Sequence, residues 1–243
     1  MKVIYDGTFE GFLTLVYDVY YTKLRPKEIL KHEPEVLLFE PLHTVFTDTI
    51  KAQKVLLALK QKFEPEHYQR IFHAFLCDTD AFEMALLDFI VLGFTHQRSL
   101  NNITLPLIFK MHCLEKELLR LVHKLYGFTR FEELEDGSLY AKISSKYNVL
   151  PFLGEHFKKR LGNHTFYLHD IKRSLAYVKT DSHAFIHTVD SFETPKFSLE
   201  EEQTKALWKT FFQHVSIENR RNEKLQKQHV PLLYRTYMCE FQQ

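Results

Sequence analysis

The hydrophobic period of the chain changes at Gly127, and this change constrains the fold more than any other feature. Before Gly127, apolar residues recur at helical spacing in residues 51–63, 67–77, 80–94 and 105–126. After Gly127, apolar and polar residues alternate, as they do in strands. Helical segments followed by strands in one chain are typical of the α+β class.

The segments after Gly127 follow the order β-β-α-β-β-β. Asp136 and Gly137 form a tight-turn signal between residues 128–134 and 139–143, which predicts a hairpin. The next helix has its start and stop signals at Asn148, Pro151 and Gly162. The last three strands are predicted at residues 165–170, 174–180 and 183–189. We therefore expect an antiparallel sheet covered by one helix.

The two ends of the chain also carry local signals. Residues 2–5 predict a strand, Thr8 can cap a helix that runs to about residue 23, and residues 43–49 predict another strand, with a loop between these last two segments. Near the C-terminus, Ser198 and Glu201 form a capping box at the start of a last helix. We expect one α+β domain over residues 1–243, made of a helical part (1–126), a sheet with a helix (127–195) and a C-terminal helix with a basic tail (196–243).

Composition and spacing exclude several classes of protein. No apolar run approaches the ~20 residues that span a bilayer, so we expect a cytoplasmic protein with no membrane partner. Cys77, Cys113 and Cys239 are far apart and show no CxxC spacing, which favours free thiols over a zinc site, an iron–sulfur cluster or a disulfide scaffold. The histidines show no HxH or HExxH spacing, so we expect no metal and no cofactor.

Positive charge is concentrated in two segments of a nearly neutral chain. The whole chain has a net charge of +1. Residues 142–173 contain seven lysines and arginines but two acids, and residues 219–235 contain five and one. These segments predict a surface for an anionic partner.

Several blocks of the sequence resemble a known family. They are YDGTFEGFL (5–13), GFTRFEELEDGSLYAKI (127–143), the segment 148–160, HDIKR (169–173) and the segment 207–235. They resemble a bacterial family described as probable DNA metabolism proteins, a domain of unknown function, and the resemblance covers essentially the full length. It implies a radical-SAM partner protein in DNA modification or repair, and related versions of the domain are fused to uracil-DNA glycosylases. DNA is the substrate that these associations share.

The chain departs from that family in ways that limit its chemistry. Members often have a proline and a histidine where this chain has Ser145 and Tyr147, so any role of that histidine is absent here. The chain also contains no glycosylase segment and no CxxxCxxC motif. Uracil excision and radical chemistry within this chain are therefore disfavoured.

Four residues form the candidate catalytic cluster. His156 and Arg160 are four residues apart and share a helix face, while Asp170 and Arg173 lie at the end of a strand that we expect beside that helix. A histidine near an aspartate suits a general base, and two arginines can clamp a phosphodiester. The alternative is a structural ion-pair network that holds the helix to the sheet.

Further residues are candidates for nucleic-acid binding. Arg120 and His123 lie on a basic ridge near a helix end, and Arg130 follows it, although the helix dipole alone also favours cations there. The tail contributes Arg220, Asn222, Gln226 and Tyr234, a mixture that suits phosphate contact and base stacking. The alternative is a C-terminal extension packed on the body of the protein. Asp6 is either a catalytic base or metal ligand, or a turn-forming residue.

Three functions follow from these observations. The first is a nucleic-acid-binding accessory protein in DNA repair or modification that acts with a radical-SAM partner. The second is a hydrolase or glycosylase-like enzyme that acts on a DNA lesion through His156 and Asp170. The third is a protein–protein adaptor, which predicts an exposed apolar patch around Phe72, Phe75 and Phe82.

Overall fold

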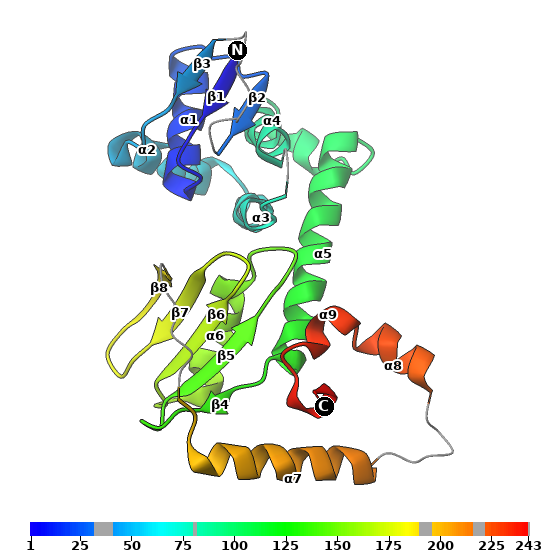
Figure 1. Ribbon diagram of the computed structural model, residues 1–243. Coiled ribbons are helices and arrows are strands. Elements are labelled where there is room, and N and C mark those ends of the chain that lie inside the picture. The colour runs from blue at the N-terminus through cyan, green and yellow to red at the C-terminus, as the bar shows by residue number, and fades with distance from the viewer. Residues whose placement is uncertain (32–40, 80–81, 190–195, 216–221, 243) are drawn as a thin grey trace. The chain divides into compact units, whose positions relative to one another are not determined.

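The computed structural model describes residues 1–31, 41–79, 82–189, 196–215 and 222–242. The chain divides into two compact units, Met1–Leu118 and Leu119–Gln243, and helix α5 (Pro106–Phe128) belongs to both (Figure 1). The fold class is α+β, as the change of period predicts. That the chain forms one domain stays a prediction.

The first unit begins with a small parallel sheet. Its strand order is β2-β1-β3, with β1 at Lys2–Ile4, β2 at Glu28–Leu30 and β3 at Leu42–Thr44. Helix α1 (Phe9–Tyr21) connects β1 to β2, and Thr8 caps it as predicted, since its hydroxyl accepts a bond from the Gly11 amide at 2.9 Å. Strand β2 lies in the segment predicted as a loop. It is three residues long and is a strand because it pairs with β1.

Asp6 forms the turn between β1 and α1. Its carboxylate accepts bonds from the Thr8 amide at 2.9 Å and the Thr8 hydroxyl at 2.7 Å, and also from the Thr47 hydroxyl. Burial opposes ionisation, but these hydrogen bonds outweigh it and lower the pKa of Asp6. The geometry is that of the turn-forming alternative.

Three helices and a short 3₁₀ helix complete the first unit. They are α2 (Thr49–Lys62), α3 (Pro65–Leu76), α4 (Phe82–Thr95) and η1 (Gln97–Asn101). The predicted helices at 51–63, 67–77 and 80–94 match them within two residues, and residues 80 and 81 lie outside the described part. Helix α4 is buried along most of its length, as its apolar sequence predicts.

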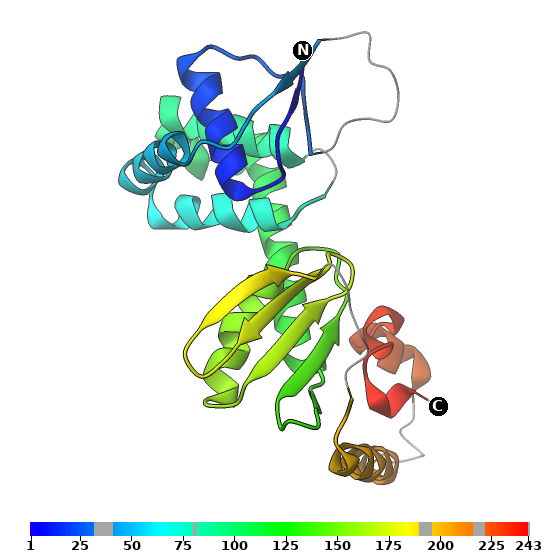
Figure 2. The same cartoon turned by 60° about the vertical axis from the view of Figure 1, so that its left-hand side comes forward.

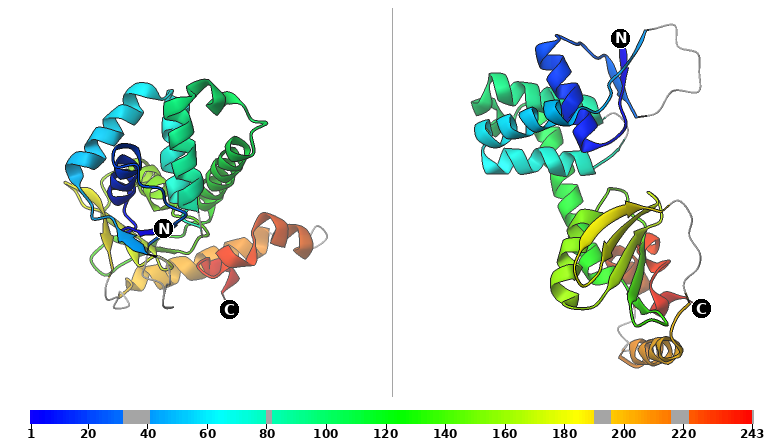
Figure 3. Two further views of the ribbon diagram at one scale, coloured as in Figure 1. Left: turned by 90° about the horizontal axis from the view of Figure 1, so that it is seen from above. Right: turned by 90° about the vertical axis from the view of Figure 1, so that its left-hand side faces the viewer.

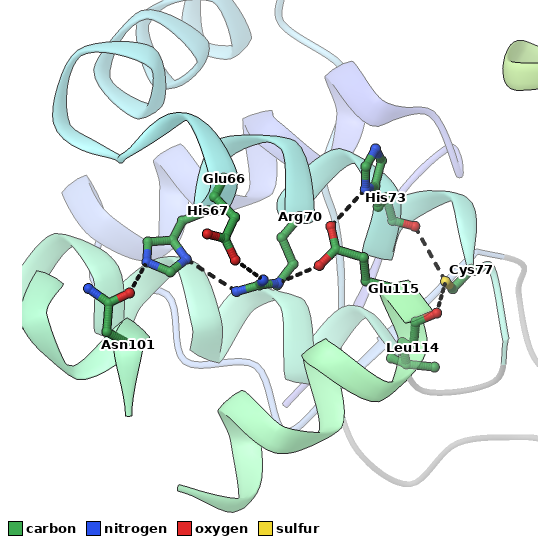
Figure 4. Close-up of polar contacts among 8 residues, drawn as sticks. All are labelled: Glu66, His67, Arg70, His73, Cys77, Asn101, Leu114 and Glu115. Atoms are coloured by element: carbon green, nitrogen blue, oxygen red, sulfur yellow. Dashed lines mark hydrogen bonds and ion pairs between the residues drawn. The ribbon is translucent and has the colours of Figure 1, made fainter. Parts of the chain in front are cut away.

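A buried polar network joins α3 to η1 and to α5 (Figure 4). Arg70 donates to Glu115 at 2.7 Å and to Nδ1 of His67 at 3.2 Å. Because arginine can only donate, His67 carries its proton on Nε2, which donates to Oδ1 of Asn101 at 3.0 Å. Nδ1 of His73 bonds the second carboxylate oxygen of Glu115 at 2.8 Å.

This network holds α3 to η1 and α5, whose contacting residues follow 34 and 45 positions later in the chain. The side chains of His67 and Arg70 are 2% and 4% exposed, so each needs a partner inside the protein. Burial disfavours the charge on Glu115, but the bonds from His73 and Arg70 outweigh it and lower the pKa of Glu115. Glu115 is therefore a charged acceptor shared by both side chains.

The second unit contains a five-stranded mixed sheet. Its strand order is β4-β5-β6-β7-β8, with the strands at Glu132–Glu133, Leu139–Ile143, Phe166–Asp170, Leu175–Lys179 and Ala184–Thr188. The prediction of an antiparallel sheet holds for three of the pairs but is wrong for β5 and β6, which are parallel. The reason is helix α6 (Leu150–Leu161), which returns the chain to the end of the sheet where β5 begins, so that β6 runs in the same direction as β5.

Helix α6 lies against one face of this sheet, as Figure 2 and the right-hand view of Figure 3 show. The approach is close at Gly154, where an added Cβ would lie 2.1 Å from the ring of Tyr177. Lys179 on β7 donates to the carbonyls of Gly162 and His164 at 2.7 and 3.0 Å, which ties the end of α6 to the sheet.

The C-terminal part contains α7 (Leu199–Val215), α8 (Glu223–His229), α9 (Leu232–Arg235) and the 3₁₀ helix η3 (Cys239–Phe241). Of the two hydrogen bonds of the predicted capping box, the one to the Ser198 hydroxyl is present, and the Glu201 carboxylate has a different partner. Ser198 accepts a bond from the Glu201 amide at 3.1 Å, but the Glu201 carboxylate accepts from the Glu133 amide at 2.9 Å. The box therefore also ties α7 to strand β4.

The network of the first unit predicts an acid-sensitive stability. The lowered pKa of Glu115 means that its contribution is present above the pKa of an unfolded glutamate and is lost as the pH falls below about 4. We expect Glu115→Gln to lower the free energy of unfolding at neutral pH by about 1–3 kcal/mol, because Arg70 and His73 lose a charged acceptor while Arg70 keeps the exposed Glu66 carboxylate at 2.6 Å. Urea unfolding followed by circular dichroism measures this loss.

Glu10→Gln is the matched control, since Glu10 is exposed on α1. The control should keep the wild-type stability and its loss in acid, whereas Glu115→Gln should lose less on acidification. Parallel pH profiles for all three proteins would show that Glu115 does not carry the effect.

Candidate nucleic-acid interface

The structure separates His156 and Arg160 from Asp170 and Arg173, the other two residues of the candidate catalytic cluster. Because α6 connects the parallel strands β5 and β6, it runs opposite to them, and its last turn lies near the start of β6. Arg160 is exposed in that last turn of α6, near the first residue of β6. Asp170 is the last residue of β6 and therefore lies at the other end of that strand. Among the described residues, no contact joins His156 to Asp170.

Asp170 and Arg173 form a buried ion pair that holds two loops together. Arg173 donates to the Asp170 carboxylate at 2.9 Å and to the carbonyls of Ser145 and Lys146 at 3.2 and 2.9 Å. The Asp170 side chain is fully buried, and burial raises its pKa although Arg173 acts in the opposite direction. The pair has the geometry of the structural alternative, and it connects the loop after β5 to the turn after β6.

His156 packs against an aromatic ring. Its ring stacks on Tyr126 of α5 with a centroid distance of 3.9 Å. Burial, followed by the charges of Arg160 and Lys159, lowers the pKa of His156, so the ring is neutral at pH 7. This contact joins α6 to α5, and a catalytic role of His156 stays a prediction.

The three residues predicted to bind nucleic acid at the end of α5 differ in their exposure and in their partners within the protein. Arg120 and His123 are exposed on α5 and can meet an anion. Arg130 instead donates to Glu240 and to the Gly127 carbonyl, both at 2.7 Å.

The described tail residues are mainly structural. Asn222 caps α8 by accepting a bond from the Leu225 amide at 3.0 Å. The ring of Tyr234 lies 5.5 Å from that of Phe128, and burial raises the pKa of Tyr234. Gln226 is exposed on α8, and Arg220 lies outside the described residues. The tail thus has the geometry of a packed extension at Tyr234.

The sheet has a second face, which α6 does not cover and which the sequence analysis did not identify. On it, cross-strand pairs connect Tyr140 to Tyr167, Tyr167 to Val178, and Val178 to Phe185. Directly paired residues point to the same side of a sheet. Tyr177, one residue from Val178, points the other way onto α6, so this row points away from the helix.

A second row on the same side carries nitrogen groups. It connects Lys142 to His169, His169 to Ala176, and Ala176 to His187. We call these two rows together the open face, because α6 packs on the other face of the sheet, as Figure 2 shows. Its residues are Tyr140, Lys142, Tyr167, His169, Ala176, Val178, Phe185 and His187. At β5, Lys142 lines cavities together with Trp208 of α7 and Tyr234 of α9.

The open face is only partly exposed. Tyr140, His169 and Ala176 are buried, and the Tyr140 hydroxyl bonds Nδ1 of His169 at 2.9 Å, whereas Phe185 on the edge strand is 48% exposed. Beyond the second row, Lys146 and Lys172 are exposed at the ends of β5 and β6. Aromatic rings with flanking cations on a sheet can stack nucleobases and contact phosphates.

A sequence signal for this face existed in the spacing of single strands. Tyr140 and Lys142 are two residues apart, as are Tyr167 and His169. Alternation places each pair on one side of its own strand, but only the register shows that the four side chains share a face.

The family comparison covers this unit. A sequence model of a domain of unknown function, DUF4130, matches residues 80–240. The chain belongs to this family. The DUF4130 match includes the whole five-stranded sheet with its open face, as well as α6 and α7. The chain matches no curated protein.

Two further observations concern the described residues of this DUF4130 member. None of their helices is both long and apolar enough to cross a bilayer. They also hold no group of three or more histidine, cysteine, aspartate or glutamate side chains that could bind a metal ion.

The role of Arg173 can be tested through stability. We expect Arg173→Ala to lower the free energy of unfolding by about 3–5 kcal/mol, because the variant leaves the Asp170 carboxylate buried without its cation. Arg160→Ala is the matched control, since Arg160 is exposed at the end of α6. Urea unfolding should leave the control near the wild type, and equal stability of all three proteins would refute the structural role of the pair.

Proposed function

We propose that this DUF4130 protein is a nucleic-acid-binding accessory protein in DNA repair or modification that acts with a radical-SAM partner. The observation that supports DNA binding is the open face of the five-stranded sheet. It combines aromatic side chains with lysine and histidine side chains, and two exposed lysines lie at its edge.

Physical chemistry favours a single strand on such a face. The bases of a single strand are free to stack on aromatic rings, and cations beside the rings contact the phosphates. In the open face, the rings of Phe185 and Tyr167 are at least partly exposed, as are Lys142 and His187, whereas Tyr140, His169 and Ala176 are buried. The net charge near zero implies modest affinity, which a partner protein can increase.

Binding is proposed over hydrolysis because of the separation of His156 and Asp170. Each side chain has its own partner, Tyr126 for the histidine and Arg173 for the aspartate. A general base needs its orienting group and its substrate within hydrogen-bond reach. The predicted dyad lacks this arrangement in the described residues.

A surface for a protein partner is available on α7. Leu207, Phe211 and Val215 recur every four residues and are 71%, 56% and 60% exposed. Such an apolar stripe on a helix is typical of a protein-binding surface. The patch expected around Phe72, Phe75 and Phe82 is absent, because Phe82 is buried and Phe75 packs against Phe82 and Phe12.

The proposal predicts salt-sensitive DNA binding through the open face. We expect a fluorescence-anisotropy titration with single-stranded DNA to show an affinity that falls as salt rises, because phosphate contacts release counterions. Phe185→Ala should weaken this binding by about 1–3 kcal/mol through the loss of a stacking ring. Double-stranded DNA should bind more weakly, since its bases are already stacked.

Ile186→Ala is the matched control. Ile186 is the next residue of β8, is 42% exposed and points to the opposite side of the sheet. Equal losses for Phe185→Ala and Ile186→Ala would remove the open face from the proposal. No binding of either DNA at low salt would refute a stand-alone DNA-binding role.

The partner surface can be tested separately. We expect Leu207→Lys with Phe211→Lys to abolish co-elution with the radical-SAM protein in size-exclusion chromatography, because the charges oppose apolar contact with α7. Leu57→Lys is a control at an exposed leucine of α2 in the first unit. Unchanged co-elution of the double variant would exclude α7 as the contact.

A further inference from the structure

A large cavity lies at the β4–β5 end of the open face. Its volume is about 700 Å³, within the range of ligand sites in proteins. Strands β4 and β5 contribute Glu132 and Lys142 to its wall, and α7 contributes Lys205 and Trp208. The C-terminal segment closes another side with Tyr237 and Cys239.

Four aromatic side chains line the cavity, and two of them, Trp208 and Phe197, have a cation close to the ring. Phe131, Phe197, Trp208 and Tyr237 line it. The Arg130 guanidinium lies 5.9 Å from the centre of the Trp208 ring, and Nζ of Lys205 lies 4.6 Å from that of Phe197. These contacts fix the rings in place, so a flat ligand can stack on them without reordering the side chains.

The charges of the cavity are already balanced. Arg130 pairs with Glu240 at 2.7 Å, and the Glu240 side chain is 2% exposed. Lys205 pairs with Glu132. A free anion would compete with these carboxylates, whereas a neutral flat ligand with polar edges would not.

The cavity contains no activated nucleophile among its described side chains. Burial, and then the neighbouring Glu240 carboxylate, raises the pKa of the Cys239 thiol. The thiol is therefore neutral at pH 7 and donates to Glu240 at 3.7 Å. This chemistry suits binding of the ligand rather than attack on it.

The cavity adjoins the open face at strand β5. Lys142 belongs to both, since it lies in the second row and lines the cavity. Glu132 of the cavity wall pairs with Tyr140, but Tyr140 is buried and does not line the cavity. A strand that contacts Lys142 therefore brings a nucleotide to the cavity.

We propose that this cavity receives one unstacked nucleobase of the bound strand, stacked on Trp208. The inference rests on the proposed function and adds a site to it. The open face contacts the strand along its length, and the cavity binds a single base. Proteins that handle single bases use such pockets to read a base that has left the stack.

Trp208 is the only tryptophan of the chain, so its fluorescence reports this site directly. We expect oligothymidylate to quench the fluorescence in step with the anisotropy change. An oligonucleotide of the same length made of abasic sugars should bind more weakly and leave the fluorescence almost unchanged, since it has no base to stack. Trp208→Leu should weaken oligothymidylate binding by at least about fivefold.

Leu199→Ala is the matched control, because Leu199 lies on the same helix α7, is 86% exposed and does not line the cavity. It should bind like the wild type. Anisotropy that reports binding without quenching of wild-type Trp208 would overturn the cavity proposal and leave the proposed function standing. Absence of any anisotropy change at low salt would overturn both, and neither result depends on the folding of a variant.

Discussion

The packing of α6 on one face of the five-stranded sheet is the constraint on which the second unit depends. Gly154 allows the helix to approach Tyr177, and Lys179 holds the end of the helix through two carbonyls. Because the helix also connects β5 to β6, these strands must be parallel. The same packing leaves the open face of the sheet free of α6. The position of the open face is thus a consequence of where this helix lies.

Charge density in the sequence does not show which cations have partners inside the protein. Arg173 and Arg130 belong to basic segments, yet both bond carboxylates and carbonyls within the second unit. A buried carboxylate needs a cation, and a nearby arginine satisfies this need before any ligand arrives. Lys146 and Lys172 are exposed at loop positions, and they also have contacts within the protein, since Lys172 donates to the Lys146 carbonyl at 3.5 Å and Nζ of Lys146 lies 4.8 Å from the centre of the Tyr147 ring.

The DUF4130 family match covers the part of the molecule that contains the open face and the cavity. The match covers residues 80–240, which contain the open face and nearly all the residues around the cavity. The first unit shows a different use of polar residues. There Arg70, His67 and Glu115 satisfy one another inside the protein and stabilise the contact of three elements.

The sequence by itself determined the local structure. Thr8, Ser198 and the turn at Asp136 and Gly137 act through bonds to neighbours in the chain, and periodicity depends on the same short range. The α+β class followed from these signals. Tertiary structure decided the parallel pairing of β5 with β6, the partner of each charge and the alignment of Tyr140, Tyr167 and Phe185. These depend on strand register and on contacts between residues far apart in the chain, which no local pattern contains.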